Sequence, residues 1–132
     1  MNCRSMMLFA AISGFILVAL GAFSAHFLNR ILGTNEMAWI RTGLEYQAFH
    51  TLALLALAVE VRRRCNLWFY WSAALLALGT VLFSGSLYCF ALSQLKIWVY
   101  VTPVGGVSFL LGWALMVVGV LRWKSNKAEC HE

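Results

Sequence analysis

Four long apolar segments constrain the fold of this chain more than any other feature of its sequence. They cover about residues 6–28, 43–61, 67–92 and 102–121, and most charged residues lie between them or at the chain ends. A helix of about 20 apolar residues crosses a hydrocarbon core of about 30 Å. With 62% hydrophobic and 11% charged residues, a soluble domain of this size could not bury its apolar surface. The sequence therefore predicts an all-α integral membrane protein, with residues 1–132 forming a single membrane domain.

The distribution of lysine and arginine predicts the orientation of these helices. Cytoplasmic loops of membrane proteins carry an excess of both residues, which here predicts an antiparallel four-helix bundle with both termini in the cytoplasm. The net charge of +5 then reflects topology and contacts with anionic lipids at the cytoplasmic face, and nucleic acid is not an expected partner. Seven basic residues lie on the predicted cytoplasmic side (Arg4, Arg62, Arg63, Arg64, Arg122, Lys124 and Lys127) and three on the other side (Arg30, Arg41 and Lys96).

Two local signals predict where the second and fourth helices begin. Thr42 and Glu45 have the spacing of a capping box, in which the glutamate reaches back to the first residue of a helix. This spacing predicts a polar connection over residues 29–41 and a capping role for Glu45. Pro103 is tolerated in a first helical turn, which predicts that the fourth helix begins near residue 102.

Small residues recur with a period of seven in the apolar segments. This period keeps them on one face of helices that cross at about 20°, where they let two backbones approach closely. In the second segment the same register contains Gly43, His50 and Leu57, which predicts that His50 points into the bundle. The residues predicted to mediate helix packing are Gly14, Gly21, Ser72, Gly79, Gly105, Gly112 and Gly119.

Polar side chains gather in the outer half of the predicted bundle, whereas the inner half is almost entirely apolar. One interpretation is a polar pocket that binds a ligand, since ionisable groups within membrane spans usually have a function. The other is a network of hydrogen bonds that fixes the helix register. Both interpretations remain open. The candidate binding residues are His26, Glu45, Tyr46, Gln47, His50, Ser84, Ser86, Tyr88, Thr102 and Ser108.

No catalytic motif accompanies this polar cluster. The chain has no phosphate loop, no paired carboxylates and no Cys-x-x-Cys or His-x-x-x-His spacing, so no catalytic residue, cofactor or metal site is predicted. His26 and His50 fall at different depths, which disfavours haem or metal ligation between them. The terminal Cys130-His131-Glu132 is interpreted as an untied tail.

An enzyme acting on a lipid or quinone at the outer leaflet, with a histidine and a carboxylate for acid–base work, stays open as a function class, but no sequence motif supports it. Non-enzymatic functions are favoured. A small accessory or assembly protein of the membrane requires the fewest further assumptions. The alternative is binding or transport of a small molecule, lipid or ion on the outer-leaflet side, through the polar cluster around His50. Expected partners are the lipid bilayer and either a second copy of the chain or another membrane protein.

Four motifs carry a resemblance to a known family. They are LGAFSAH at 20–26, EYQAFH at 45–50, LFSGSLY at 82–88 and TPVGG at 102–106. Together, and in this order, they resemble the YgdD-like family of small bacterial inner-membrane proteins. The resemblance covers the whole chain and implies a multi-pass protein of the bacterial cell inner membrane. It implies no activity, because none is established for the family.

Overall fold

The structure is a computed structural model that describes residues 2–63 and 66–122. Every regular element in these residues is helical, and four helical segments are long and apolar enough to cross a membrane. The prediction of four apolar helices is thus confirmed. Arg64, Lys124 and Lys127, used above for the orientation, and the tail at 130–132 lie outside the described residues.

Two of the four segments contain a π-helical turn. The first combines α1, the π turn η1 and α2, and the third combines α4, the π turn η2 and α5, whereas the second and fourth are the single helices α3 and α6. The bounds are α1 Cys3–Phe23, η1 Ser24–Leu28, α2 Asn29–Ile31, α3 Thr34–Arg63, α4 Leu67–Gly79, η2 Thr80–Ser84, α5 Gly85–Ser93 and α6 Ile97–Leu121.

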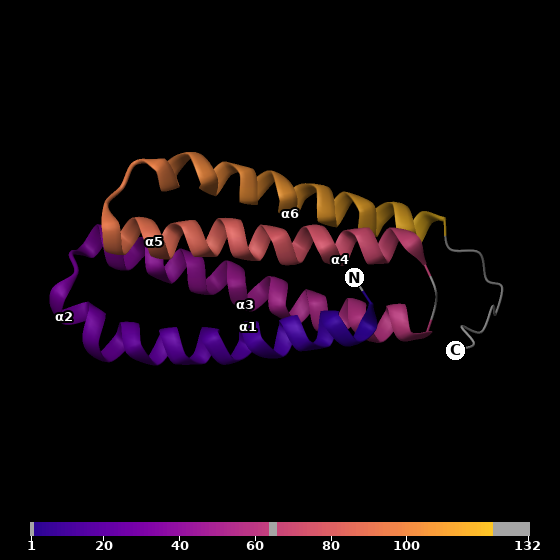
Figure 1. The fold of residues 1–132 in the computed structure, drawn as a ribbon, viewed down its shortest axis with the longest axis horizontal. Helices are drawn as coiled ribbons and strands as arrows, with labels where there is room; N and C mark the ends of the chain where they lie inside the picture. Colours follow the sequence, from indigo (N-terminus) through magenta and orange to yellow (C-terminus); the bar gives the residue numbers. More distant parts are fainter. Residues whose placement is uncertain (1, 64–65, 123–132) are drawn as a thin grey trace.

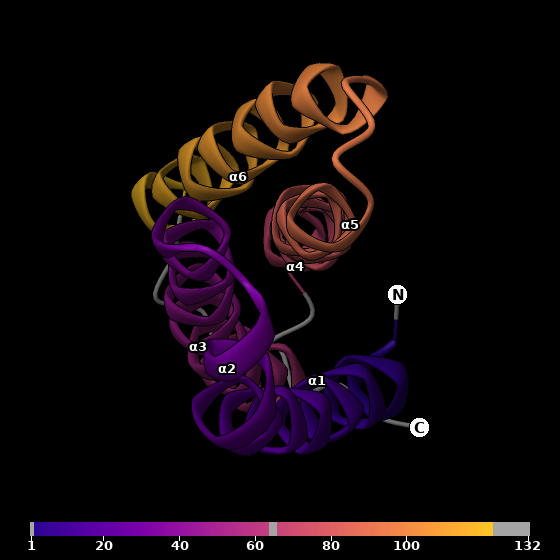
Figure 2. The same ribbon diagram turned by 90° about the vertical axis from the view of Figure 1, so that its left-hand side faces the viewer.

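The four segments lie side by side along the long axis of the molecule (Figure 1). The connections at 32–33 and 94–96 lie at one end, called the loop end below, and residues 2, 66 and 122 lie toward the opposite, terminal end. Seen along the axis, α1, α3 and α6 form a curved row with α4 and α5 on its concave side (Figure 2). The most extensive contacts join α4 with α6 and α1 with α3.

The capping box predicted at Thr42 is wrong, because α3 begins at Thr34 and continues through it. The Thr42 hydroxyl donates a hydrogen bond of 3.0 Å to the carbonyl oxygen of Ala38, one turn earlier in the same helix. Glu45 lies eleven residues after Thr34, about 17 Å along the axis, so it cannot reach the first turn. The acidic residue of that turn is Glu36.

The fourth helix also begins earlier than predicted, at Ile97. Pro103 therefore lies in the second turn and not in the first. The proline ring removes the hydrogen bond that would reach the carbonyl of Val99, a residue that is exposed at the loop end.

Close contact between the third segment and α6 depends on glycine. A Cβ atom at Gly105 would collide with the backbone nitrogen of Phe83 and lie 2.8 Å from its Cα atom. The Ser72 hydroxyl donates a hydrogen bond of 2.7 Å to the carbonyl of Gly112, which joins the same two segments nearer the terminal end. Cβ atoms at three further glycines of these two segments would come too close to side chains: Gly79 to Phe109, Gly112 to Leu76 and Gly119 to Phe69.

Gly14 and Gly21 do not take part in such contacts among the described residues. The nearest atom to a Cβ at Gly14 would be the Thr51 methyl group at 4.0 Å, an ordinary contact, and a Cβ at Gly21 would meet nothing within 4 Å. The packing role predicted for Gly21 is therefore wrong. Both residues lie on α1, whose main contacts are with α3 and do not require a close backbone approach there.

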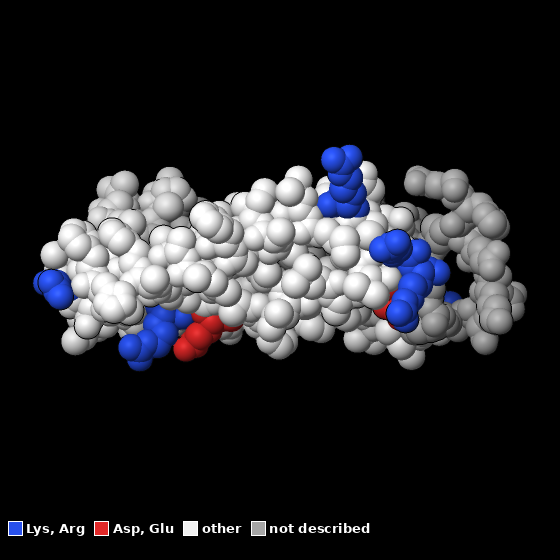
Figure 3. Space-filling model, turned by 90° about the horizontal axis from the view of Figure 1, so that it is seen from below, with Lys and Arg blue, Asp and Glu red and all other residues white. Residues whose placement is uncertain are grey.

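Two apolar cores hold the segments together. The larger one includes Met6, Leu54 and Leu76, and the smaller one, toward the loop end, is formed by Leu28, Ile40 and Ala91. The charged side chains visible in Figure 3 lie toward the two ends of the molecule, with an uncharged band between them. This distribution is typical of a protein whose middle faces hydrocarbon.

Candidate functional site

The predicted polar cluster does not form one site, because its residues on α3 lie on two different faces of that helix. Gln47 points toward the first and third segments, where it is buried. Glu45, Tyr46 and His50 instead line a groove beside α6.

On the first face, four side chains form a closed hydrogen-bond network. The Gln47 amide donates to the Ser13 carbonyl oxygen at 2.9 Å and lies 3.2 Å from the Ser13 hydroxyl. The Ser13 and Thr51 hydroxyls are 2.7 Å apart, and the Tyr88 hydroxyl donates to the Gln47 carbonyl oxygen at 2.7 Å. The network thus joins α1, α3 and α5 and uses the hydrogen-bonding groups of Gln47 internally.

Most of the remaining cluster residues are also paired locally. The Ser86 and Thr102 hydroxyls are 2.8 Å apart, and the Ser108 hydroxyl donates to the Leu75 carbonyl at 2.8 Å. The Ser84 hydroxyl is buried in the π turn η2 without a hydrogen-bond partner. His26 is exposed on η1 and does not line the groove around His50.

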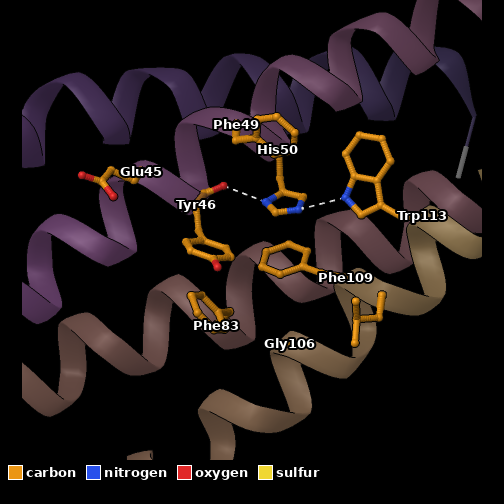
Figure 4. Close-up of a pocket in the computed structure, with 9 residues that line it drawn as sticks. Glu45, Tyr46, Phe49, His50, Phe83, Gly106, Phe109 and Trp113 are labelled. Atoms are coloured by element: carbon orange, nitrogen blue, oxygen red, sulfur yellow. Dashed lines mark hydrogen bonds between the residues drawn. The ribbon is translucent and has the colours of Figure 1, made fainter.

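The groove lies between α3 and α6 and has a volume of about 560 Å³ (Figure 4). Phe83, from the π turn η2, contributes to its wall. Several of its lining side chains are also exposed on the outside of the bundle, Leu110 by 72% and Phe49 by 58%, so the groove opens toward the surroundings of the protein. The lining residues are Glu45, Tyr46, Phe49, His50, Phe83, Gly106, Phe109, Leu110 and Trp113.

His50 is held in a fixed orientation within this groove, as Figure 4 shows. It is only 3% exposed, and its Nδ1 atom lies 2.8 Å from the carbonyl oxygen of Tyr46. A carbonyl can only accept, so Nδ1 carries the proton. The Nε2 atom then accepts the indole N–H of Trp113 at 3.2 Å. The prediction that His50 points into the bundle is confirmed.

Both ring nitrogens of His50 are therefore engaged in hydrogen bonds. A metal or haem iron binds the lone pair of an imidazole nitrogen, and here the lone pair of Nε2 is used by Trp113. The described residues also contain no group of three His, Cys, Asp or Glu side chains that could hold a metal ion. The ring of His50 instead stacks on Phe109, with a centroid distance of 3.5 Å and an interplanar angle of 7°.

Aromatic rings form most of the remaining groove wall. The Tyr46 and Phe83 ring centroids are 4.5 Å apart, and those of Phe49 and Trp113 are 5.6 Å apart. These contacts connect α3 to η2 and to α6. Binding sites for small molecules are usually lined in this way, by apolar and aromatic side chains with a few polar groups among them.

Glu45 is the acidic residue of the groove, and the other lining residues include neither lysine nor arginine. Arg41 precedes it by one helical turn, but no ion pair joins these two side chains, both of which the structure describes. The Glu45 side chain is exposed, and its carboxylate lies at the end of the groove that is nearer the loop end. A carboxylate beside aromatic rings can bind a cation or accept a proton.

Six groove residues were not predicted from the sequence: Phe49, Phe83, Gly106, Phe109, Leu110 and Trp113. Their helical spacing contains a signal. Gly106, Phe109, Leu110 and Trp113 are related by steps of three and four, so they share one face of α6. A search for polar residues could not find this aromatic face.

Comparison with known proteins agrees with the helical membrane architecture. A model of a family described as "Protein of unknown function (DUF423)" matches residues 20–106. The chain is 67% identical to the UPF0382 inner membrane protein YgdD of Escherichia coli over the full length of both. It is 47% identical to a UPF0382 membrane protein of Haemophilus influenzae, over 87% of this chain and 92% of that one. A UPF0382 membrane protein of Staphylococcus saprophyticus is 37% identical over 85% of this chain and 92% of its own length.

No solved structure matches the chain. The relatives are named as membrane proteins without a stated activity, and four spans in the chain are able to cross a bilayer. The protein is thus a multi-pass inner-membrane protein, in agreement with the resemblance noted from its motifs. The chain belongs to the DUF423 family of uncharacterised membrane proteins, which the names of its relatives call UPF0382.

Proposed function

We propose that this protein is a non-enzymatic binding protein of the inner membrane, which receives an amphipathic molecule from the bilayer in the groove between α3 and α6. The groove itself carries the proposal. It is large enough for a drug-sized molecule, mostly aromatic, and open through exposed apolar side chains. A molecule dissolved in the lipid could therefore enter sideways without crossing water.

We propose further that the single membrane domain is an antiparallel bundle with both termini in the cytoplasm. The short connections at 32–33 and 94–96 support this topology, because each joins two long helical segments. The excess of basic residues on the side of the termini supports the orientation and a preference for anionic lipids at that face. In this orientation the loop end faces the periplasm.

The depth of the groove suits an amphipathic molecule. Arg41 and Arg62 are 21 residues apart on α3, about 32 Å, which matches a hydrocarbon core of about 30 Å. Glu45 then lies about 6 Å below the level of Arg41, and His50 about 14 Å below it. The groove would thus extend from near the outer interface toward the middle of the bilayer.

Binding is favoured over chemistry by the way the polar groups are used. His50, the natural acid or base of the groove, has both ring nitrogens in hydrogen bonds. The side chains of the network around Gln47 are hydrogen-bonded to one another, and none of them lines the groove. The groove therefore provides an apolar cavity and the negative charge of Glu45, which are sufficient to bind a ligand.

Photolabelling tests the proposal. The protein is placed in phosphatidylcholine nanodiscs and irradiated with a neutral fatty alcohol that carries a diazirine, and the modified residues are mapped by mass spectrometry. We expect labels to concentrate on Phe49, Leu110 and Trp113. Gly106→Leu should remove them, because a Cβ at Gly106 meets only the Phe83 ring at 3.9 Å and a longer side chain would fill the groove without disturbing the fold.

The matched control is Gly21→Leu, which adds the same side chain in open space on α1. It should leave the labels in place. Labels spread evenly over all lipid-facing helices, and equal in both variants, would refute a binding groove.

A further inference from the structure

The groove contains one charge whose hydrogen-bonding and ion-pairing capacity is unused, the carboxylate of Glu45. We propose that the groove selects an amphipathic organic cation, with its charged centre beside Glu45 and its apolar body along the aromatic rings toward Trp113. This inference rests on the proposed function of the same groove and adds the chemical class of the ligand.

The charge of the lining residues favours a cation over an anion or a neutral molecule. Glu45 supplies a negative charge, and no lysine or arginine lines the groove. His50 supplies no positive charge in its present arrangement, because its Nε2 accepts the Trp113 N–H and therefore carries no proton. A cation would be attracted without competition from a basic lining residue.

The aromatic wall favours the same ligand class. A cation within about 6 Å of an aromatic ring centroid is attracted to the face of the ring. Five of the nine lining residues are phenylalanine, tyrosine or tryptophan: Tyr46, Phe49, Phe83, Phe109 and Trp113. Tyr46 lines the same groove as Glu45, so a ligand with its charged centre at the carboxylate would have an aromatic ring beside it in the groove.

The competing charge nearest in sequence is Arg41, one turn before Glu45. It is exposed, does not line the groove and forms no ion pair with Glu45, although both residues are described. A phospholipid is the obvious alternative occupant. Repulsion from the Glu45 carboxylate would oppose a headgroup of net negative charge in the groove.

Two probes of the same shape and opposite charge test the inference. Tetraphenylphosphonium is a cation, and tetraphenylborate is its anionic counterpart. Binding of each is measured by equilibrium dialysis against the protein in phosphatidylcholine nanodiscs, with empty nanodiscs as the blank. We expect saturable binding of the cation only.

Three variants identify the residue responsible. Glu45→Gln keeps the size of the side chain and removes its charge, so it should weaken cation binding about tenfold, because the attraction between two opposite charges is lost. Glu45→Asp should retain most of the affinity. Glu36→Gln removes a carboxylate from the first turn of the same helix, outside the groove, and should change nothing.

The neutral photolabel described above separates this inference from the proposed function. If Glu45→Gln keeps the photolabel in the groove and also keeps full cation binding, selection by charge is refuted while the groove stands. Equal binding of the two probes, or a phospholipid retained in native mass spectrometry, would refute it as well. Absence of both the photolabel and the cation from the wild-type groove would refute both proposals.

Discussion

Helix α3 presents polar side chains on two faces, and the two faces use them in opposite ways. Toward α1 and α5, Gln47 donates to Ser13 and accepts from Tyr88, so its amide is saturated. Toward α6, the Glu45 carboxylate has no recorded hydrogen bond or ion pair among the described residues, and the same holds for the Tyr46 hydroxyl. Hydrogen bonds between membrane helices can serve packing alone. The candidate site is therefore identified by the polar groups that have no hydrogen-bond partner in the described part of the chain, the Glu45 carboxylate and the Tyr46 hydroxyl, and not by the presence of polar residues.

The largest effect on the free energy of unfolding is expected from a substitution that separates α6 from the third segment. Gly105→Leu would place a side chain into the backbone of Phe83. We expect a loss of about 3 kcal/mol in the free energy of unfolding, because neither backbone can give way without shifting a helix. Unfolding in bicelles by titration with sodium dodecyl sulfate measures it. The neighbouring Gly106→Ala has room for its methyl group and should cost less than about 0.5 kcal/mol. Equal losses in the two variants would contradict the close approach at Gly105.

An intermediate effect is expected from the saturated face. Gln47→Leu removes the acceptor of the Tyr88 hydroxyl and the donor to Ser13. We expect a loss of about 1–2 kcal/mol, since a buried hydroxyl is left without its partner. Photolabelling of the groove should be unchanged in this variant. Loss of labelling at unchanged stability would mean that Gln47 belongs to the site and that the two faces are not independent.

The smallest and sharpest test uses two tyrosines. Tyr88→Phe deletes a hydroxyl that donates to Gln47 at 2.7 Å, whereas Tyr46→Phe deletes one that lacks a recorded partner. We expect a loss of about 0.6 kcal/mol, the typical value of an interhelical hydrogen bond in a membrane, for Tyr88→Phe. Tyr46→Phe should leave the unfolding midpoint unchanged. A larger loss for Tyr46→Phe than for Tyr88→Phe would reverse the assignment of the two faces.

The sequence was sufficient to predict the four helices and the inward direction of His50. Hydropathy determines the first, because only long apolar helices satisfy their backbone in lipid. The second followed from the register of Gly43 and Leu57, both of which are buried together with His50. The length of an apolar run and the period of small residues are both properties of the chain alone.

The start of α3 was mispredicted for a physical reason. Residues 34–41 contain the polar residues Thr34, Asn35, Glu36 and Arg41, and a few polar residues do not separate a helical turn from a loop. The structure shows that this stretch is helical and that its Ile40 is buried in the smaller core. The spacing of Thr42 and Glu45 matched a cap by coincidence, so Glu45 received a structural role in addition to its place among the candidate binding residues.

The π turns and the groove could not be predicted from local sequence. The π turn η2 contains Phe83, whose backbone lies against Gly105 on another helix. Phe49 and Leu110 are exposed and apolar, as lipid-facing side chains are in any span. They line the groove because they lie on the two helices that form its walls, Phe49 on α3 and Leu110 on α6.

Because α6 forms the second wall of the groove, the groove is completed late in the synthesis of the protein. The chain emerges from the ribosome from its N-terminus, so α6 is the last of these four segments to enter the membrane. Until it arrives, His50 lacks the indole that binds its Nε2, and the groove has only one of its two helical walls. A nascent chain with only the first three segments in the membrane therefore has an incomplete groove, and α6 adds its second wall.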